Sequence, residues 1–153
     1  MKILVTGASG SIGKEIVKQL IKDNEIICFD RNEEKVFYLA KEILDLYPEA
    51  KLTICLGSIT NTHRLLEVFE LYRPDIVYHA AANKHVPLGE QNIHEFIYNN
   101  IKGTINLANV TKAYPVKLDK PLTGILKADV KTKFDMLSVE KSQYQNIQNS
   151  GTV

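Results

Sequence analysis

The sequence predicts an α/β fold with a doubly wound parallel sheet that stops after about the fourth or fifth strand. Three observations support this prediction. Short β-rich runs alternate with helical patterns over residues 1–113, a glycine-rich turn joins the first run to the first helix, and the alternation ends near residue 114. Such alternation is typical of βαβ units with helices on both faces of a sheet. We therefore expect one domain over residues 1–114 and an atypical tail over residues 115–153.

The first two thirds of the chain contain four predicted strands, each rich in β-branched or aromatic residues. They cover Lys2–Thr6, Glu25–Phe29, Leu52–Leu56 and Asp75–His79. Cys28 and Cys55 lie inside the second and third of these apolar runs. Buried, reduced thiols are therefore expected at both positions, rather than a disulfide or a metal site.

The segments between and after these strands predict four helices. The first has apolar residues at Ile12, Ile16 and Leu20, which we expect to face the sheet. Asn32 is expected to cap the second helix, and Asn61 or Thr62 the third, which should stop near Pro74. A single long helix is predicted from Glu90 to Ala113, with an apolar face formed by Ile93, Ile97, Ile101, Ile105 and Ala108.

The tail after Tyr114 has a different composition, ending in many Gln, Asn and Ser residues. Its segment 126–136 alternates like an edge strand but also fits a helix, and about the last ten residues are expected to be disordered. If the fourth strand is left at the edge of the sheet, its backbone is unpaired there. We therefore expect the tail or a partner to cover this edge.

The overall composition is that of a globular protein, with 44% hydrophobic and 24% charged residues. The formal net charge of +1 provides no global field that would attract nucleic acid or an anionic membrane. The start of the chain lacks the pattern of a signal peptide, and no apolar stretch approaches the ~18 residues that cross a bilayer. We expect a cytoplasmic protein without a nucleic-acid partner or a membrane span.

The segment Thr6–Gly13, TGASGSIG, follows a predicted strand and opens a predicted helix. We call residues 7–13 the glycine turn. Gly7 suits a tight turn, Gly10 has no Cβ to block a diphosphate, and Gly13 allows close packing of helix and strand. The diphosphate would meet free amides at the positive end of the helix. This context indicates a Rossmann-type NAD(P) site, against the alternative of a glycine-rich loop without a ligand.

Asp30 and Arg31 end the second strand and bear on the choice between NAD and NADP. The Asp30 carboxylate is placed to accept hydrogen bonds from the adenosine ribose hydroxyls and would repel a 2′-phosphate. Arg31 could instead bind that phosphate. We favour NAD. The plainer alternative is that both residues only solvate a turn.

Four segments occur in an order that resembles a known family: TGASGSIG, FDRNEEKVFYL, RPDIVYHAAANKHVPLGEQN and NNIKGTIN. The chain resembles the extended short-chain dehydrogenases that act on nucleotide sugars, and within them the CapD-like UDP-GlcNAc-type 4,6-dehydratases of polysaccharide biosynthesis. HAAANKHVPL is the most specific of these segments, and the resemblance covers about residues 1–114. It implies contacts to the cofactor diphosphate, adenosine, nicotinamide ribose or sugar from Gly7, Ala8, Gly10, Ser11, Ile12, Gly13, Asp30, Arg31, Ser58, Ile59, Ala80, Ala81, Ala82 and Lys84.

The resemblance also implies a catalytic Tyr and Lys, four residues apart, on a helix after a fifth strand, often with an Asp-Lys pair on that strand. Neither the helix nor the strand is recognisable here. Tyr47 with Lys51 and Tyr98 with Lys102 match that spacing, but at other places in the predicted fold. Asp119-Lys120 lacks the apolar strand that should precede it. His85 and Asn100 are interpreted as structural. We therefore predict no catalytic residue and no metal site.

The leading hypothesis is the NAD(P)-binding portion of a nucleotide-sugar 4,6-dehydratase or epimerase-like protein, with weak or absent activity of its own. The alternative from another class is a non-enzymatic dinucleotide-sensing or protein-interaction module. A third possibility is an enzyme that takes its catalytic half from a complementary polypeptide. A UDP-sugar and a second copy of the chain are further candidate partners.

Overall fold

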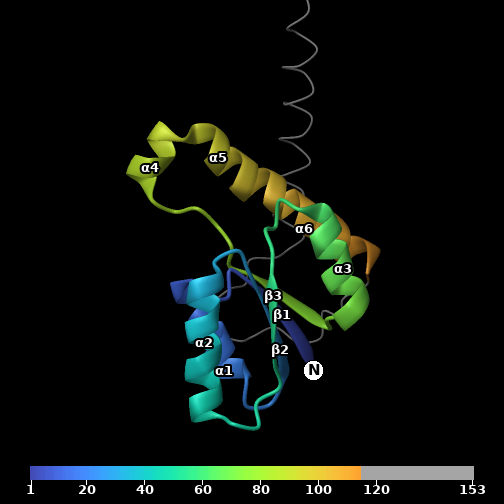
Figure 1. Cartoon of the computed structure of the whole chain (residues 1–153). Coiled ribbons are helices and arrows are strands. Elements are labelled where there is room, and N and C mark those ends of the chain that lie inside the picture. The colour runs from blue at the N-terminus through green and yellow to red at the C-terminus, as the bar shows by residue number, and fades with distance from the viewer. Residues whose placement is uncertain (115–153) are drawn as a thin grey trace, which may run out of the picture. The chain divides into compact units, whose positions relative to one another are not determined.

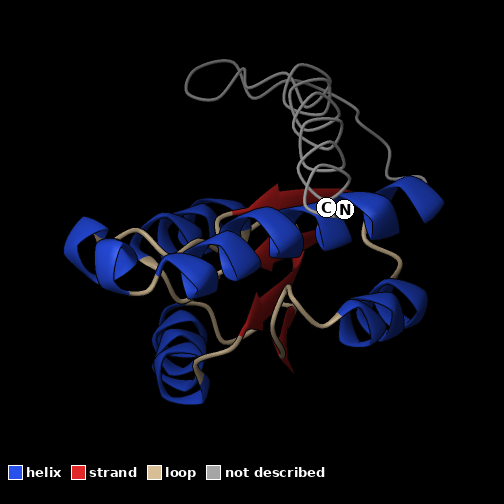
Figure 2. Cartoon of the chain, turned by 90° about the horizontal axis from the view of Figure 1, so that it is seen from above, coloured by secondary structure: helices blue, strands red, loops and turns tan. Residues whose placement is uncertain are grey.

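The computed structural model describes residues 1–114, which form a four-stranded parallel sheet with helices on both faces (Figure 1, Figure 2). The strands are β1 (Lys2–Thr6), β2 (Glu25–Asp30), β3 (Leu52–Leu56) and β4 (Ile76–His79). Their order is β3-β2-β1-β4, with every pair parallel. The chain therefore moves outward from β1 in one direction and then returns to its other side. This arrangement confirms the predicted doubly wound sheet, while the expectations for the tail lie outside the described residues.

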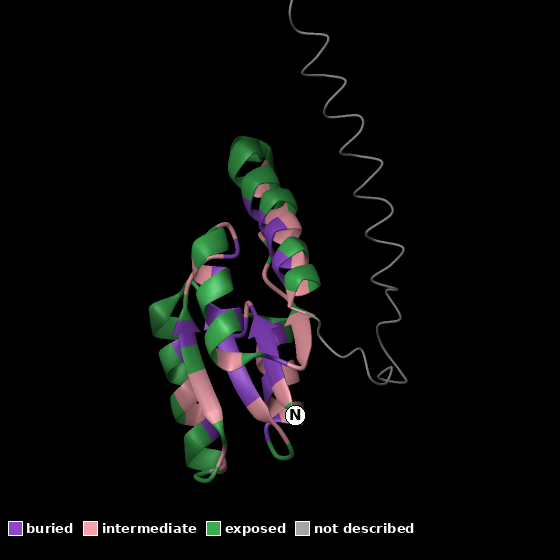
Figure 3. Cartoon of the chain, turned by 90° about the vertical axis from the view of Figure 1, so that its right-hand side faces the viewer, coloured by how far each residue is buried: buried purple, intermediate pink, exposed green. Residues whose placement is uncertain are grey.

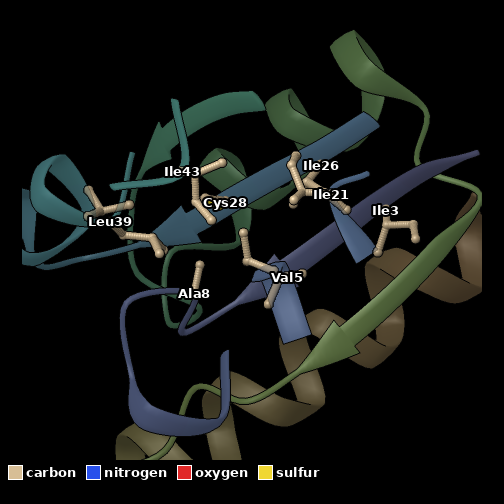
Figure 4. Packing of buried hydrophobic residues seen from close by; sticks show 10 residues of the cluster. Ile3, Val5, Ala8, Ile21, Ile26, Cys28, Leu39 and Ile43 are labelled. Atoms are coloured by element: carbon tan, nitrogen blue, oxygen red, sulfur yellow. The ribbon is translucent and has the colours of Figure 1, made fainter. Parts of the chain in front are cut away.

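One face of the sheet is covered by α1 (Ser11–Leu20) and α2 (Glu33–Leu46). Side chains alternate between the two faces along each strand, so every second residue of β1 and β2 points towards these helices. Figure 4 shows part of the resulting core. Its buried residues are Ile3, Val5, Ala8, Val17, Ile21, Ile26, Cys28, Val36, Leu39 and Ile43.

The opposite face is covered by α3 (Thr62–Tyr72) and α6 (Gly103–Ala113). The buried residues of this second core are Leu4, Ile27, Phe29, Cys55, Ile59, Leu65, Val68, Phe69, Leu107 and Val110. Cys28 and Cys55 are buried in opposite cores, and both thiols are free. The expectation of buried, reduced cysteines is therefore confirmed.

Both predicted asparagine caps are present. The Asn32 side chain accepts a hydrogen bond from the Lys35 amide at 2.9 Å, and that of Asn61 accepts one from the Arg64 amide at 3.0 Å. Each bond satisfies an amide that the first turn of a helix leaves unpaired. The third helix ends as predicted before Pro74, at Tyr72, and its C-cap residue Arg73 has a left-handed φ of 48°.

The predicted sheet-facing side of α1 is wrong at its start. Ile12 is 66% exposed, and the buried positions on this side of the molecule are Gly13, Val17 and Ile21. Gly13 lies against the glycine turn and so fixes which side of the helix faces inward. Ile12 precedes it by one residue, about 100° around the helix, and points to solvent.

After β4 the chain forms α4 (Val86–Gln91), α5 (Ile93–Ile97), the π-helix η1 (Tyr98–Lys102) and α6. The predicted single helix is therefore interrupted. Asn92, with φ −134° and ψ 49°, separates α4 from α5. A π-helical turn then precedes α6. We call residues 86–101 the helical arm, which extends to one side of the sheet in Figure 1.

The predicted apolar face of this long helix is only partly buried: Ile105 and Ala108, at its C-terminal end, are half-buried. Ile93, Ile97 and Ile101 are 56%, 41% and 41% exposed, and most of the helical arm is exposed in Figure 3. The buried positions of η1 and α6 are instead Asn99, Gly103, Asn106, Leu107 and Val110.

The loop after β3 explains this orientation. A Cβ on Gly103 would lie 2.6 Å from the Ile59 side chain, so glycine allows the helix to approach this loop closely. The Asn106 side chain donates hydrogen bonds to the carbonyl oxygens of Ile59 at 3.2 Å and Thr60 at 3.1 Å. These contacts turn the buried side of α6 towards the loop and the isoleucines away from it.

Within residues 1–114, no helix is both long and apolar enough to cross a membrane. The same residues contain no group of three or more His, Cys, Asp or Glu side chains that could hold a metal ion.

Candidate functional site

The glycine turn lies between the ends of β2 and β4. Gly7 has a φ of 66°, and its amide donates to the carbonyl oxygen of Phe29 at 2.9 Å. A Cβ at Gly7 would lie 2.7 Å from the backbone of Ala81. Both the left-handed backbone and the close approach therefore require glycine at this position.

Gly10 and Gly13 lie at the start of α1 and have different roles. A Cβ on Gly13 would overlap the carbonyl oxygen of Gly7, so glycine is needed for packing there. At Gly10 a Cβ would meet only that carbonyl oxygen, at 3.2 Å, and otherwise open space. No side chain caps α1, and its first turn has no acidic residue. The exposed start of this helix therefore carries amides and a partial positive charge that suit an anion.

The Asp30 carboxylate ties the glycine turn to the end of β2. Its Oδ2 atom accepts hydrogen bonds from the amide of Ser9 at 2.9 Å and the hydroxyl of Ser9 at 2.8 Å. Its Oδ1 atom accepts from the Asn32 amide at 2.9 Å, and the residue is only 8% exposed. A carboxylate has about four lone-pair positions, so about one remains for a further donor. Sequence reasoning missed Ser9, although a hydroxyl inside the glycine turn was the available signal.

A pocket of about 230 Å³ opens at the carboxyl ends of the strands, beside the glycine turn. Nine residues predicted for the site line it: Gly7, Gly10, Asp30, Arg31, Ser58, Ile59, Ala80, Ala81 and Ala82. Seven others that the sequence did not single out for it also line it: Ser9, Phe29, Asn32, Lys35, Gly57, Asn83 and Asn99. Residues from all four strand ends therefore meet around one cavity.

Five predicted site residues lie off the pocket lining. Ala8 is fully buried in the core beneath α1 and α2, because the turn carries it inward. Gly13 is buried too and acts in packing. Ser11 and Ile12 are exposed at the start of α1, and Lys84 is exposed beyond the end of β4.

A chain of hydrogen bonds connects residues that line the pocket. The Arg31 guanidinium donates from Nη2 to Oδ1 of Asn83 at 2.8 Å. Asn83 is fixed by Asn100, whose Oδ1 accepts from the Asn83 amide and whose Nδ2 donates to the Asn83 carbonyl, both at 2.8 Å. The Asn99 side chain also donates to Oδ1 of Asn100, at 2.9 Å. The structural role expected for Asn100 is therefore seen, and it comes from a π-helical turn, a feature often found at functional sites.

Two threonines hold the end of β4. Oγ1 of Thr6 lies 2.7 Å from Nδ1 of His79, and Nε2 of His79 lies 3.0 Å from Oγ1 of Thr104. The Thr104 hydroxyl donates to the carbonyl oxygen of Asn100. This network joins β1, β4 and α6 beside the site, and sequence reasoning did not single it out.

The residues with the Tyr-Lys spacing lie away from the pocket, as expected. Tyr47 and Lys51 line a groove near the amino ends of β1 and β3. Tyr98 and Lys102 are exposed on η1. His85 is exposed too, and within residues 1–114 its imidazole forms no hydrogen bond, so the structural bond expected there is not found.

The fold and this site define the class of protein. In open parallel sheets, ligands bind at the carboxyl ends of the strands where the strand order reverses, which here is between β1 and β4. A glycine turn after β1 and a carboxylate at the end of β2 complete the features of a Rossmann-type mononucleotide-binding half.

Comparisons with known proteins give the family. The family described as "Polysaccharide biosynthesis protein" matches residues 3–118, and the chain belongs to it. Capsular polysaccharide biosynthesis protein CapD of Staphylococcus aureus is 38% identical over 143 residues, which cover 92% of this chain and 21% of that protein. The inverting UDP-N-acetylglucosamine 4,6-dehydratase of Campylobacter jejuni is 37% identical over 108 residues, covering 69% of this chain and 30% of that enzyme.

A solved structure is similar to this chain in fold. WbmG of Bordetella bronchiseptica, solved in complex with NAD and UDP, superposes with a TM-score of 0.61 at 28% sequence identity. The match covers 75% of this chain and 35% of WbmG. The chain thus spans about a fifth to a third of the length of the relatives it matches.

Proposed function

We propose that residues 1–114 bind NAD(P) as the cofactor-binding part of a nucleotide-sugar 4,6-dehydratase or epimerase-like protein. The observation that carries this proposal is the exposed, uncapped start of α1, which lies at the glycine turn beside the switch point of the sheet. The complex of WbmG with NAD and UDP supports it. A cytoplasmic location remains part of the same proposal.

The residues present fit the diphosphate of such a cofactor. Open space at Gly10 lets phosphate oxygens approach the amides of the first turn, and no acidic side chain opposes them there. The pocket is smaller than the ~300–1,000 Å³ of a typical ligand site, so a dinucleotide would extend beyond it. Ala80, Ala81 and Ala82 line the pocket at the end of β4 with small side chains and would accommodate the nicotinamide ribose.

The residues at the end of β2 favour NAD over NADP. Asp30 retains about one acceptor position for a ribose hydroxyl and would repel a 2′-phosphate. Arg31, which could attract that phosphate, is directed towards Asn83. The bound nicotinamide would supply the hydride acceptor, while this chain binds and orients the cofactor.

The activity of the whole protein belongs to the same proposal. A UDP-sugar is the proposed substrate, and no residue in 1–114 is assigned a catalytic role. The exposed isoleucines of the helical arm favour one further candidate, in which the rest of a dehydratase fold, from this or another polypeptide, packs against the arm.

Calorimetric titration of the 153-residue chain with NAD and NADP tests the proposal. We expect binding of NAD by the parent and at least a tenfold loss for Gly10→Val, because the added side chain occupies the space meant for the diphosphate. Lys51→Val is the matched control, since it adds an exposed valine near the amino ends of the strands. It should bind like the parent.

Circular dichroism establishes that both variants fold. A folded Gly10→Val protein with the parent's affinity contradicts the proposed site. Formation of a 4-keto sugar from UDP-GlcNAc would assign turnover to this chain itself and contradict the expected weak or absent activity.

A further inference from the structure

We propose that Asn83 is a positioning residue that sets the cofactor preference of this site by holding the Arg31 guanidinium away from the adenosine 2′ position. The inference rests on the proposed function and deepens it. It predicts that the preference for NAD depends on the uncharged side-chain amide of Asn83, which lies in the loop after β4 and not at the end of β2.

The hydrogen bond between Arg31 and Asn83 spans the site. Arg31 follows β2 and Asn83 follows β4, and these strands are separated in the sheet by β1. The 2.8 Å bond therefore joins the loops that follow the two neighbours of β1. Both residues line the pocket.

Asn83 is the fixed partner in this pair. Its amide and its carbonyl oxygen are both bound by the Asn100 side chain, each at 2.8 Å. Asn100 is in turn held by Asn99, which is buried. Arg31, in contrast, is exposed and its long side chain has many rotamers. Asn83 therefore selects the direction of Arg31, and not the reverse.

Asn83 directs Arg31 without neutralising it. An amide oxygen carries no net charge, and within residues 1–114 no carboxylate forms an ion pair with Arg31. The adjacent Asp30 carboxylate is engaged by Ser9 and Asn32. The guanidinium thus keeps its charge and its remaining donors, which suit a phosphate monoester.

A released Arg31 would not act alone on a phosphate. Lys35, on the first turn of α2, lines the same pocket. The positively charged side chains of Arg31 and Lys35 would lie on either side of the end of β2, where Asp30 would accept a hydrogen bond from the ribose. The site therefore contains the charges for a 2′-phosphate, and the bond to Asn83 keeps one of them turned away.

The test measures the dissociation constants of NAD and NADP for the 153-residue chain and its variants by calorimetry. Asn83→Ala releases Arg31 and should shift the NADP-to-NAD affinity ratio about tenfold towards NADP, the value of one charge-assisted hydrogen bond. Asn83→Asp holds Arg31 in an ion pair and adds a negative charge, so the ratio should shift away from NADP. A merely structural role for Asn83 would shift both variants in the same direction.

Arg31→Gln is the matched control, because glutamine can still donate to Asn83 but has no charge. We expect it to change the parent's ratio little and to abolish the gain in NADP affinity in the Asn83→Ala background. An unchanged ratio in Asn83→Ala, or equal shifts in the alanine and aspartate variants, overturns this inference alone. If the parent binds neither dinucleotide, the proposed function itself is contradicted and this inference falls with it.

Discussion

The glycine turn and the helical arm are constrained in opposite ways. In the glycine turn, added side-chain atoms at Gly7 and Gly13 would collide with backbone atoms, so these residue types are fixed by close packing. In the helical arm, by contrast, large apolar side chains such as Val86, Leu88 and Ile93 are 67%, 55% and 56% exposed. The difference teaches that close backbone packing determines the residue types in the glycine turn, whereas the helical arm leaves large apolar side chains exposed.

The largest expected change in the free energy of unfolding separates α6, which is packed on the sheet, from the exposed helical arm. Leu107→Ala should lower the free energy of unfolding by about 3 kcal/mol, because this side chain is buried against the sheet and leaves a cavity. Ile93→Ala, the control in the helical arm, where the residue is 56% exposed, should change it by less than about 0.5 kcal/mol. Urea denaturation measures both. Equal losses of unfolding free energy in the two variants would mean that the arm is packed as tightly as the core, which contradicts the difference described above.

A somewhat smaller effect is expected in the glycine turn. Gly13→Ala should cost about 2 kcal/mol, because its Cβ overlaps the Gly7 carbonyl oxygen and the turn must shift. Gly10→Ala, in the same turn, meets that atom at 3.2 Å and should cost less than about 1 kcal/mol. Thermal and urea unfolding compare the pair. If Gly13→Ala is as stable as the parent, close backbone approach does not determine this region.

The smallest effect concerns the core beneath the glycine turn. Burial, with smaller contributions from Asp30 and Cys55, raises the pKa of the Cys28 thiol from 9.0 to about 12. The thiol remains protonated in the folded state while it ionises in the unfolded state. Its contribution to stability is therefore complete below about pH 9 and is lost as the pH rises from about 9 to 12, by roughly 1 kcal/mol at pH 10.

Comparison of the parent with Cys28→Ala isolates this titration from that of other groups. Unfolding free energies measured between pH 7 and 10 should fall more steeply for the parent than for the variant. Parallel curves would show that water reaches this thiol, and that the core under the turn is looser than its packing indicates.

Much of the fold followed from local signals in the sequence. Asn32 and Asn61 were predicted as caps because a cap acts within three residues of its own position. The glycine turn was predicted because its glycines stand within a few residues of each other, directly between one predicted strand and the next predicted helix. The four strands were predicted because strands covered on both faces are apolar along their length.

The errors arose where distant contacts choose among several apolar faces. Gly13 against Gly7 turned Ile12 outward, and Gly103 against Ile59 turned the isoleucine stripe outward. The bond between Arg31 and Asn83 joins residues 52 positions apart, and it exists only because β2 and β4 both flank β1. No local periodicity contains that information.

The central place of β1 has a consequence for how the chain is made. β1 is synthesised before β4, yet contacts such as the hydrogen bond between Thr6 and His79 join residues 73 positions apart. Contacts between residues so far apart in the sequence require the closure of a long loop, which lowers the folding rate. During synthesis β1 can therefore pair with β2 on one side, while its other side stays unpaired until β4 has been made.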